Sequence, residues 1–356
     1  MHRSTKAAFA AAICSLALPV AADAATKTVS MGTPPTSAKA MQKLASDANA
    51  FFPTSLSVHV GDRVKFVPAG FHTVDLPAKG GKPVPLVSPT GQKLSDADAA
   101  GSPFWFAGQD QLTFTPSLAQ GLYGKSVTYD GTKGIESGLP LAAKPKPFTV
   151  TFKKAGSYTY LCDLHPGMKG TVKVLAKGKP VPSATSDANR VKLQAAVALK
   201  DARALAKTTA AANTVSVGSA NSGSGVENFA FFPSSLTVPT GTTVTFQMAK
   251  GSREAHTATT GPGDPEKEPT SYLGTLAASL QSPVFSGAAI YPSDTPGTPA
   301  ALTPTLHGNG FWSTGFMDND KASPQPAANA VKFSAPGTYT FYCLIHPFMK
   351  GTVTVQ

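Results

Sequence analysis

Two stretches of this chain match closely and decide how it is organised: residues 156–174 read GSYTYLCDLHPGMKGTVKV, and residues 337–355 read GTYTFYCLIHPFMKGTVTV. Two shorter blocks repeat at a similar interval: TVSMG at 28–32 with TVSVG at 214–218, and AFFPTSL at 50–56 with AFFPSSL at 230–236. Because this interval is the size of a domain, the repeat indicates duplication of a whole domain rather than of a short solenoid unit.

Each repeat is predicted to consist of short strands. The chain of 356 residues contains 32 Gly and 31 Pro, and its short runs rich in Thr, Val and aromatic residues are typical of β-structure. Hydrophobic residues make up 41%, which is enough for real cores and argues against a wholly disordered chain. We expect strands at 56–60, 64–67, 148–152, 157–162 and 171–175, and again at 236–238, 243–247, 330–333, 338–343 and 352–355. The simplest architecture is all-β, with two β-sandwiches in tandem.

The N-terminal residues have the pattern of a signal peptide. Arg3 and Lys6 precede the apolar run Ala7–Val20, and a small-x-small site follows at 22–24. We therefore expect residues 1–24 to be removed and the mature chain to begin at Ala25, in the periplasm or outside the cell.

The expected domains are 25–176 and 213–356, joined by a linker at 177–212. Within the linker, residues 187–212 are rich in Ala, Leu, Lys and Arg and contain no Gly or Pro, which predicts a helix. Its apolar positions are mostly Ala, so we expect an exposed spacer of roughly 35 Å. A shorter helix is expected at Ala38–Ala48.

The charge and hydropathy of the chain indicate which classes of partner to expect. The chain has 31 Lys+Arg residues and 20 Asp+Glu residues, which gives a formal net charge of +11. A positive charge of this size favours acidic partner proteins or an anionic cell surface. Solubility alone is an equally good explanation of this charge. An exported chain with no nucleic-acid-binding motif is not expected to bind nucleic acid. No later apolar run is long enough to span a bilayer, so we expect at most a peripheral association with the envelope.

The repeated loop supplies a soft set of metal donors. The candidate ligands are His72, Cys162, His165 and Met168 in the first half, and His256, Cys343, His346 and Met349 in the second. Thiolate, imidazole and thioether donors do not suit Mg²⁺ or Ca²⁺, and a thioether is a poor ligand for structural zinc. Copper accepts a plane of one Cys and two His with a weak axial Met. The pattern therefore predicts one copper ion in each half.

Other interpretations of these residues are a buried thiol, a core histidine and a packing methionine, which would have to coincide in both halves. A disulfide between Cys162 and Cys343 would leave both His-Met pairs without a role. His59 has Pro239 at the matching position and His307 has no clear counterpart, so structural or surface roles are expected for both.

With these motifs, the sequence resembles the cupredoxin family of type 1 blue copper proteins, and the plastocyanin and amicyanin branch in particular. Residues 343–351, CLIHPFMKG, are very similar to an amicyanin ligand loop. The resemblance implies two Greek-key β-sandwiches with a type 1 copper site in each, and it implies that His165 and His346 lie nearest the surface as electron ports. The stretch between the upstream His and the Cys is longer than in small members of the family, in both halves.

The function that this resemblance implies is transfer of single electrons between redox partner proteins. No His-x-His pair occurs and no His adjoins either Cys, so the second copper centre of nitrite reductases and small laccases is not expected, and the chain is not predicted to be an enzyme. The alternatives are an extracytoplasmic copper carrier or buffering protein, and an adhesion module in which one site has decayed. Gly167 in one loop is replaced by Phe348 in the other, which predicts a drier second site and different redox potentials.

Overall fold

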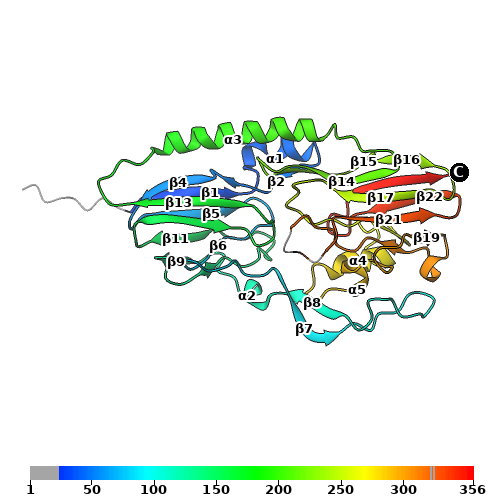
Figure 1. Cartoon of the computed structure of the whole chain (residues 1–356). Helices are drawn as coiled ribbons and strands as arrows, with labels where there is room; N and C mark the ends of the chain where they lie inside the picture. Colours follow the sequence, from blue (N-terminus) through cyan, green and yellow to red (C-terminus); the bar gives the residue numbers. More distant parts are fainter. Residues whose placement is uncertain (1–23, 321–322, 324) are drawn as a thin grey trace, which may run out of the picture.

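Two facing sheets form the first half of the computed structural model, which describes residues 24–320, 323 and 325–356 (Figure 1). One sheet has the order β3-β1-β5-β11-β9 and the other β10-β6-β12-β13-β4. The bounds are β1 Thr26–Met31, β3 Phe51–Phe52, β4 Ser55–His59, β5 Arg63–Pro68, β6 Asp75–Leu76, β9 Ser126–Tyr129, β10 Ile135–Glu136, β11 Phe148–Phe152, β12 Gly156–Leu161 and β13 Lys169–Leu175. Alternate residues such as Val64 and Phe66 face one core between the sheets.

The second half repeats this arrangement. One sheet has the order β19-β21-β17-β14-β15-β2 and the other β16-β23-β22-β18-β20. The bounds are β14 Thr214–Asn221, β15 Val226–Phe232, β16 Ser235–Val238, β17 Thr243–Met248, β18 Thr259–Thr260, β19 Ala300–Leu302, β20 Trp312–Ser313, β21 Ala328–Phe333, β22 Gly337–Tyr342 and β23 Lys350–Val355. The chain is thus mostly β, and each predicted strand has a counterpart shifted by only a few residues.

One strand of the first half completes a sheet of the second. β2, Ser46–Ala48, pairs antiparallel with β15, so that Asp47 lies opposite Glu227. The helix predicted at Ala38–Ala48 is therefore wrong in its second part: α1 spans Pro35–Gln42, and the chain turns at Ala45, where φ is 47°, before the strand begins. This pairing holds the two halves together at one edge (Figure 1).

The helix between the halves is not an exposed spacer. α3 spans Ala184–Leu205, shorter at its end than the predicted 187–212, and Ser183 caps it by accepting the Ser186 N–H. Its alanine face is buried against both halves, in a cluster of Ala195, Ala198, Ala202 and residues of α1, β2, β3 and β15. Small side chains let the helix backbone approach the sheets closely, so the alanines that suggested an exposed helix are instead its packing surface.

The long insertions of the two halves pack on each other. The arm formed by β7 Val87–Lys93 and β8 Asp110–Phe114 reaches toward α4 Tyr272–Ser279 and α5 Gly287–Ile290, whereas α2 Pro116–Ala119, which follows β8, stays with the first half (Figure 1). Phe104 and Phe106 share a core with Leu273, and the Trp105 Nε1–H donates to the Pro292 carbonyl over 2.7 Å. The short 3-10 helix η1, Leu306–Gly308, lies in the same region. The insertions therefore build a second contact between the halves.

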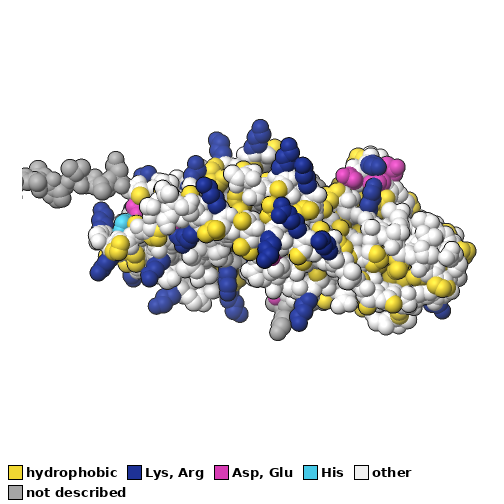
Figure 2. Space-filling model, turned by 90° about the horizontal axis from the view of Figure 1, so that it is seen from above, with side chains coloured by type: hydrophobic (Ala, Val, Ile, Leu, Met, Phe, Trp, Pro, Cys, Tyr) yellow, Lys and Arg dark blue, Asp and Glu magenta, His cyan; other side chains and the backbone are white. Residues whose placement is uncertain are grey.

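The signal peptide predicted at 1–24 lies outside the described residues except for Ala24. Among the residues that the structure describes, none of the helices has the length and hydropathy needed to span a membrane. On the face that carries α3, Lys and Arg side chains are widely spread and acidic ones gather in a small area (Figure 2).

Candidate metal centres

The first candidate group joins residues from distant parts of the first half. His72 follows β5, and Cys162 and His165 follow β12. The Nδ1 atoms of the two imidazoles lie 3.0 Å apart, and Cys162 Sγ lies 4.0 Å from that of His72 and 3.3 Å from that of His165. The three residues are 2%, 5% and 4% exposed. One sulfur and two nitrogens thus converge in an enclosed space where a metal ion can bind.

The second half brings together the matching residues. Cys343 Sγ lies 3.7 Å from His256 Nδ1 and 3.6 Å from His346 Nδ1. The two imidazole rings have their centroids 5.0 Å apart. Cys343 and His256 are completely buried. Both cysteines are free thiols, so the alternative of a disulfide between Cys162 and Cys343 is excluded in this structure.

The two methionines are buried beside these groups. The Met168 N–H donates to the His165 carbonyl over 2.9 Å, and the Cys162 N–H donates to the Met168 carbonyl over 3.0 Å. The same pair of bonds, 2.8 and 3.0 Å long, closes the loop that ends at Met349. Met168 shares the hydrophobic core with Cys162, and both methionines are at most 1% exposed. The loop therefore returns each methionine to the strand end that carries the cysteine.

Two threonines that the sequence analysis did not single out contact the sulfur atoms. The N–H groups of Thr73 and Thr257 donate to Cys162 Sγ and Cys343 Sγ, both over 3.4 Å. The hydroxyl of Thr73 accepts the N–H of Asp163, the residue after the cysteine, over 2.8 Å. The signal was present in the sequence, because a threonine follows the upstream histidine in both halves.

The surroundings favour the thiolate form of both cysteines. Burial alone raises the pKa of a thiol, but the imidazoles of His165 and His72 outweigh burial and hold the pKa of Cys162 well below its usual value. At Cys343, hydrogen bonding and charge from His256 likewise lower the pKa against the effect of burial. A thiolate is the form of cysteine that binds metals.

Comparison with known proteins supports a copper-binding family over part of this chain. Residues 125–175, which include Cys162, His165 and Met168, match the family of copper binding proteins described as plastocyanin/azurin. Amicyanin-alpha of Methylorubrum extorquens is 42% identical over 59 residues, which are 16% of this chain and 47% of that protein. Plastocyanin of the fern Dryopteris crassirhizoma is 29% identical over 136 residues, which are 38% of this chain and 95% of that protein.

Part of this chain is therefore cupredoxin-like. The chain spans about half the length of the amicyanin that it matches. Among solved structures, oxidised plastocyanin of Dryopteris crassirhizoma is 31% identical, with 40% of this chain and 99% of that one covered and a TM-score of 0.20. The family match lies within the first half, at residues 125–175, and the second half is related to it by the sequence repeat.

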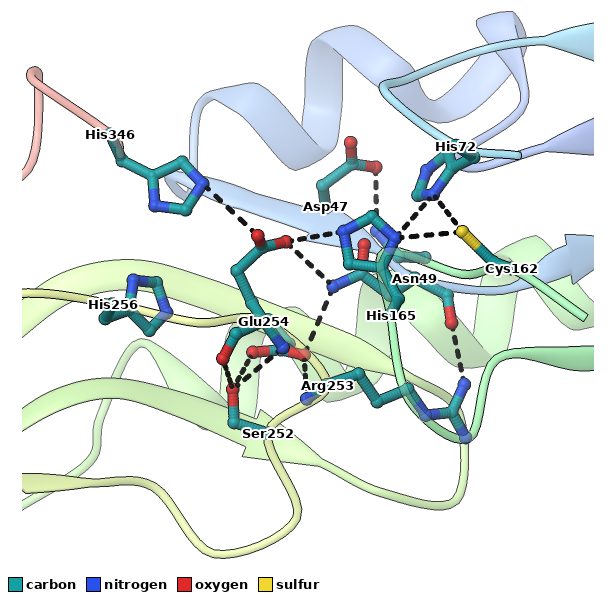
Figure 3. Close-up of polar contacts among 12 residues, drawn as sticks. Asp47, Asn49, His72, Cys162, His165, Ser252, Arg253, Glu254, His256 and His346 are labelled. Carbon is teal, nitrogen blue, oxygen red and sulfur yellow. Dashed lines mark hydrogen bonds and ion pairs between the residues drawn. The ribbon is translucent and has the colours of Figure 1, made fainter. Parts of the chain in front are cut away.

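The two loops that carry Cys162 and Cys343 face each other across the contact between the halves (Figure 3). Glu254 lies between them: its Oε2 is 2.8 Å from His165 Nε2, and its Oε1 is 3.8 Å from His346 Nε2. Burial would raise the pKa of Glu254, but the two histidines outweigh it and lower that pKa. Glu254 was not singled out from the sequence, because this residue belongs neither to the cysteine loop motif nor to the repeated blocks.

The expected electron ports are largely enclosed in this arrangement. The side chains of His165 and His346 are only 5% and 17% exposed, and Glu254 of the second half contacts His165. The upstream histidines His72 and His256 are more buried still, at 2% and 0% exposed, so His165 and His346 remain the candidate histidine ligands nearer the surface in their halves.

The expectation of a drier second site has mixed support: Cys343 and His256 are more buried than Cys162 and His72, whereas His346 is more exposed than His165. Phe348 does lie near His346, with ring centroids 6.0 Å apart, but it is itself 50% exposed.

An acidic cluster distinguishes the first site from the second. Asp75, Glu136 and Asp163 lie within reach of one another beside the cysteine loop. Burial and the neighbouring Asp163 raise the pKa of Asp75 to about 7 and that of Glu136 to about 10. In the second half, the strand partners matching Asp75 and Glu136 are Thr259 and Ser313, whose hydroxyls lie 2.8 Å apart. The first site therefore adjoins a cluster of buried carboxyl groups at a place where the second site has hydroxyl groups.

His59 and His307 have structural contacts. His59 Nε2 is 2.7 Å from the Lys179 carbonyl, and Nδ1 is 3.4 Å from Asp62. His307 lies between Asp98 and Asp294, at 3.2 and 3.3 Å, and so joins the two insertions.

Proposed function

We propose that this chain is an exported tandem cupredoxin that carries single electrons between redox partner proteins. In this proposal, residues 25–176 and 213–356 each form a Greek-key domain with one type 1 copper site, joined through 177–212. His72, Cys162, His165 and Met168 bind one ion; His256, Cys343, His346 and Met349 bind the other. The observation that carries the proposal is the same convergence of one sulfur and two Nδ1 atoms in both halves.

The donor set fits copper on its chemistry and on its packing. Among the described residues, the Nε2 atoms of His72 and His256 have no hydrogen-bond partner and are buried. A Cβ on Gly32 or Gly70 would lie 2.7 Å from His72 Nε2, so that side of the ring is closely packed. Only Nδ1 is left facing the sulfur. Bound copper supplies reversible one-electron chemistry, which a Cys-His-His plane with a distant thioether tolerates in both oxidation states.

The protein contributes a rigid and dry environment. Both cysteines directly follow a central strand, each upstream histidine lies in a loop beside that strand's end, and the N–H of Thr73 or Thr257 helps to fix the sulfur. Hydrogen bonds to a coordinating sulfur and exclusion of water are known to tune copper potentials. A preformed site of this kind changes little between oxidation states, which favours fast electron transfer.

The alternative function is copper transport or buffering outside the cytoplasm. The two functions use nearly the same ligands, but a carrier must release its metal readily. Burial of His72 and Cys162 to 2% and 5% exposure favours retention. The sequence has no His-x-His pair for a further catalytic copper, which supports a carrier of electrons rather than an oxidase or reductase.

The test is to cycle the copper-loaded chain between its oxidised and reduced states in the presence of a copper chelator. We expect the metal count per chain to stay constant over many cycles while the visible band disappears and returns. Loss of copper within the first cycles would contradict electron transport and favour the carrier function.

We also propose that the two sites differ in redox potential, because the first adjoins the cluster of Asp75, Glu136 and Asp163 and its His165 is more enclosed than His346. Voltammetry of the two single-site chains, Cys162→Ser and Cys343→Ser, measures each potential separately. Indistinguishable potentials would remove this part of the proposal.

A further inference from the structure

Glu254 is not part of the repeated pattern that defines the two sites. It lies two positions before His256, and the residue two positions before His72 is Gly70. A side chain at Gly70 would meet His72, since a Cβ there lies 2.7 Å from its Nε2. The first half therefore has no carboxylate at the equivalent position. Glu254 belongs to the second half, but it contacts His165, a candidate ligand of the first half.

The carboxylate makes a short path between the two candidate sites. From His165 Nε2 to Glu254 Oε2 the gap is 2.8 Å, and from Glu254 Oε1 to His346 Nε2 it is 3.8 Å (Figure 3). The Nδ1 atoms of the same two rings face Cys162 and Cys343, respectively. Only these two noncovalent gaps interrupt the path from one histidine ring to the other.

Contacts from both halves hold Glu254 in this position. The Asn49 Nδ2–H of the first half donates to Glu254 Oε2 over 3.4 Å, and the Glu254 N–H donates to Ser252 Oγ over 3.3 Å. The neighbouring Arg253 donates through Nη1 to the Asn49 carbonyl over 2.6 Å. These bonds adjoin the β2–β15 pairing that joins the halves, so the bridge is built on a fixed interface.

We propose that Glu254 is a positioning residue that links the two copper sites into one electron-exchanging pair, through the outer nitrogens of His165 and His346. This inference rests on the proposed copper sites. One electron leaves the reduced site and enters the oxidised site, so that one ion is oxidised as the other is reduced, and no proton or bond is transferred. Because His165 and His346 face Glu254 between the halves, they exchange electrons with each other rather than directly with a partner protein.

The first experiment needs no copper. Imidazole ¹⁵N resonances are recorded for the metal-free wild-type chain, for Glu254→Gln and for Glu266→Gln, which removes one exposed carboxylate of the same half. We expect Glu254→Gln to shift the Nε2 resonances of both His165 and His346, and Glu266→Gln to shift neither. A shift at His165 alone would show that the carboxylate serves one site and would overturn the bridge.

The second experiment measures exchange in the copper-loaded full chain. After a pulse that delivers less than one electron per chain, the electron redistributes between the sites at a rate that does not depend on protein concentration. The chains Cys162→Ser and Cys343→Ser supply the reference spectrum and potential of each site. We expect Glu254→Gln to keep both visible bands, to raise both potentials and to slow the redistribution several-fold, with Glu266→Gln resembling wild type.

The outcomes separate this inference from the function on which it rests. If the wild-type chain binds two copper ions with thiolate bands and Glu254→Gln exchanges electrons as fast as wild type, the bridge is wrong and the proposed function stands. If the wild-type chain forms no such sites, both are wrong.

Discussion

The Nδ1 atoms of His72 and His165 lie 3.0 Å apart, although the residues are separated by 93 positions in the sequence. Two imidazole nitrogens at this separation, with a thiolate sulfur beside them, form a donor set rather than a packing contact. The strand β12 and the loop that follows it bring His165 to the end of the sheet where the chain passes His72. The same pairing of loops recurs in the second half between His256 and His346.

Packing at Gly70 sets the position of His72. We predict that Gly70→Ala displaces the imidazole, because the new Cβ would lie 2.7 Å from Nε2, and that it weakens metal binding at the first site by about tenfold or more, or ~1.4 kcal/mol. Equilibrium competition with a chelator, in a Cys343→Ser background, measures this affinity. Gly223→Ala, whose Cβ meets only Asn221 Oδ1 at 3.2 Å, is the control. Equal affinities for both variants would refute the prediction.

Tyr160 has a buried hydroxyl without a hydrogen-bond partner among the described residues. The matching residue of the second half is Phe341, which is equally buried. Because an unpaired buried hydroxyl is costly, we predict that Tyr160→Phe raises the free energy of unfolding by about 1 kcal/mol. Denaturant titration of the metal-free chain checks this, and a clear loss of stability would contradict it.

The acidic cluster beside the first site predicts a pH dependence of stability. The pKa of Asp75 rises from its usual 3.8 to about 7, mainly through burial, so the folded chain keeps a proton that the unfolded chain releases. The free energy of unfolding should therefore fall as the pH rises from about 4 to about 7. In Asp75→Asn this fall should be smaller. Denaturant titrations of the metal-free chains across this range test it, and parallel curves for the two chains would count against the prediction.

The ion pairs of His307 also predict that stability depends on pH, and this dependence extends above pH 6.5. Burial lowers its pKa, but Asp294 and Asp98 outweigh this and raise it above the usual 6.5. The stabilisation is fully present below pH 6.5 and is lost as the pH rises through the folded-state pKa. Replacing His307 by Gln should lower stability most in mildly acidic solution and least in alkaline solution. Thermal unfolding measured at both extremes distinguishes this result from a uniform loss.

The strands and the candidate ligands could be predicted from the sequence because local patterns determine them. The β-branched runs locate β5 and β11, and the duplicated loop identifies Cys162 and Cys343 with their neighbours. Each loop needs only its own residues to close, through hydrogen bonds within a few positions.

The contact between the halves could not be predicted in this way. Ala195 and Ala198 suggested an exposed helix, since alanine has high helix propensity and little apolar surface, yet their small size is what lets α3 pack closely. The strand β2 forms only because β15 offers it an unpaired edge. Glu254 follows no motif, and its position depends on that interface.

The visible absorption spectrum of the oxidised copper-loaded chain, recorded with a count of metal per chain for wild type, Cys162→Ser and Cys343→Ser, shows whether each half binds one copper ion through its cysteine. We predict two copper ions and an intense blue thiolate band in wild type, and one ion with part of that band in each variant. A colourless wild-type protein, or a variant that keeps both ions, would contradict this prediction.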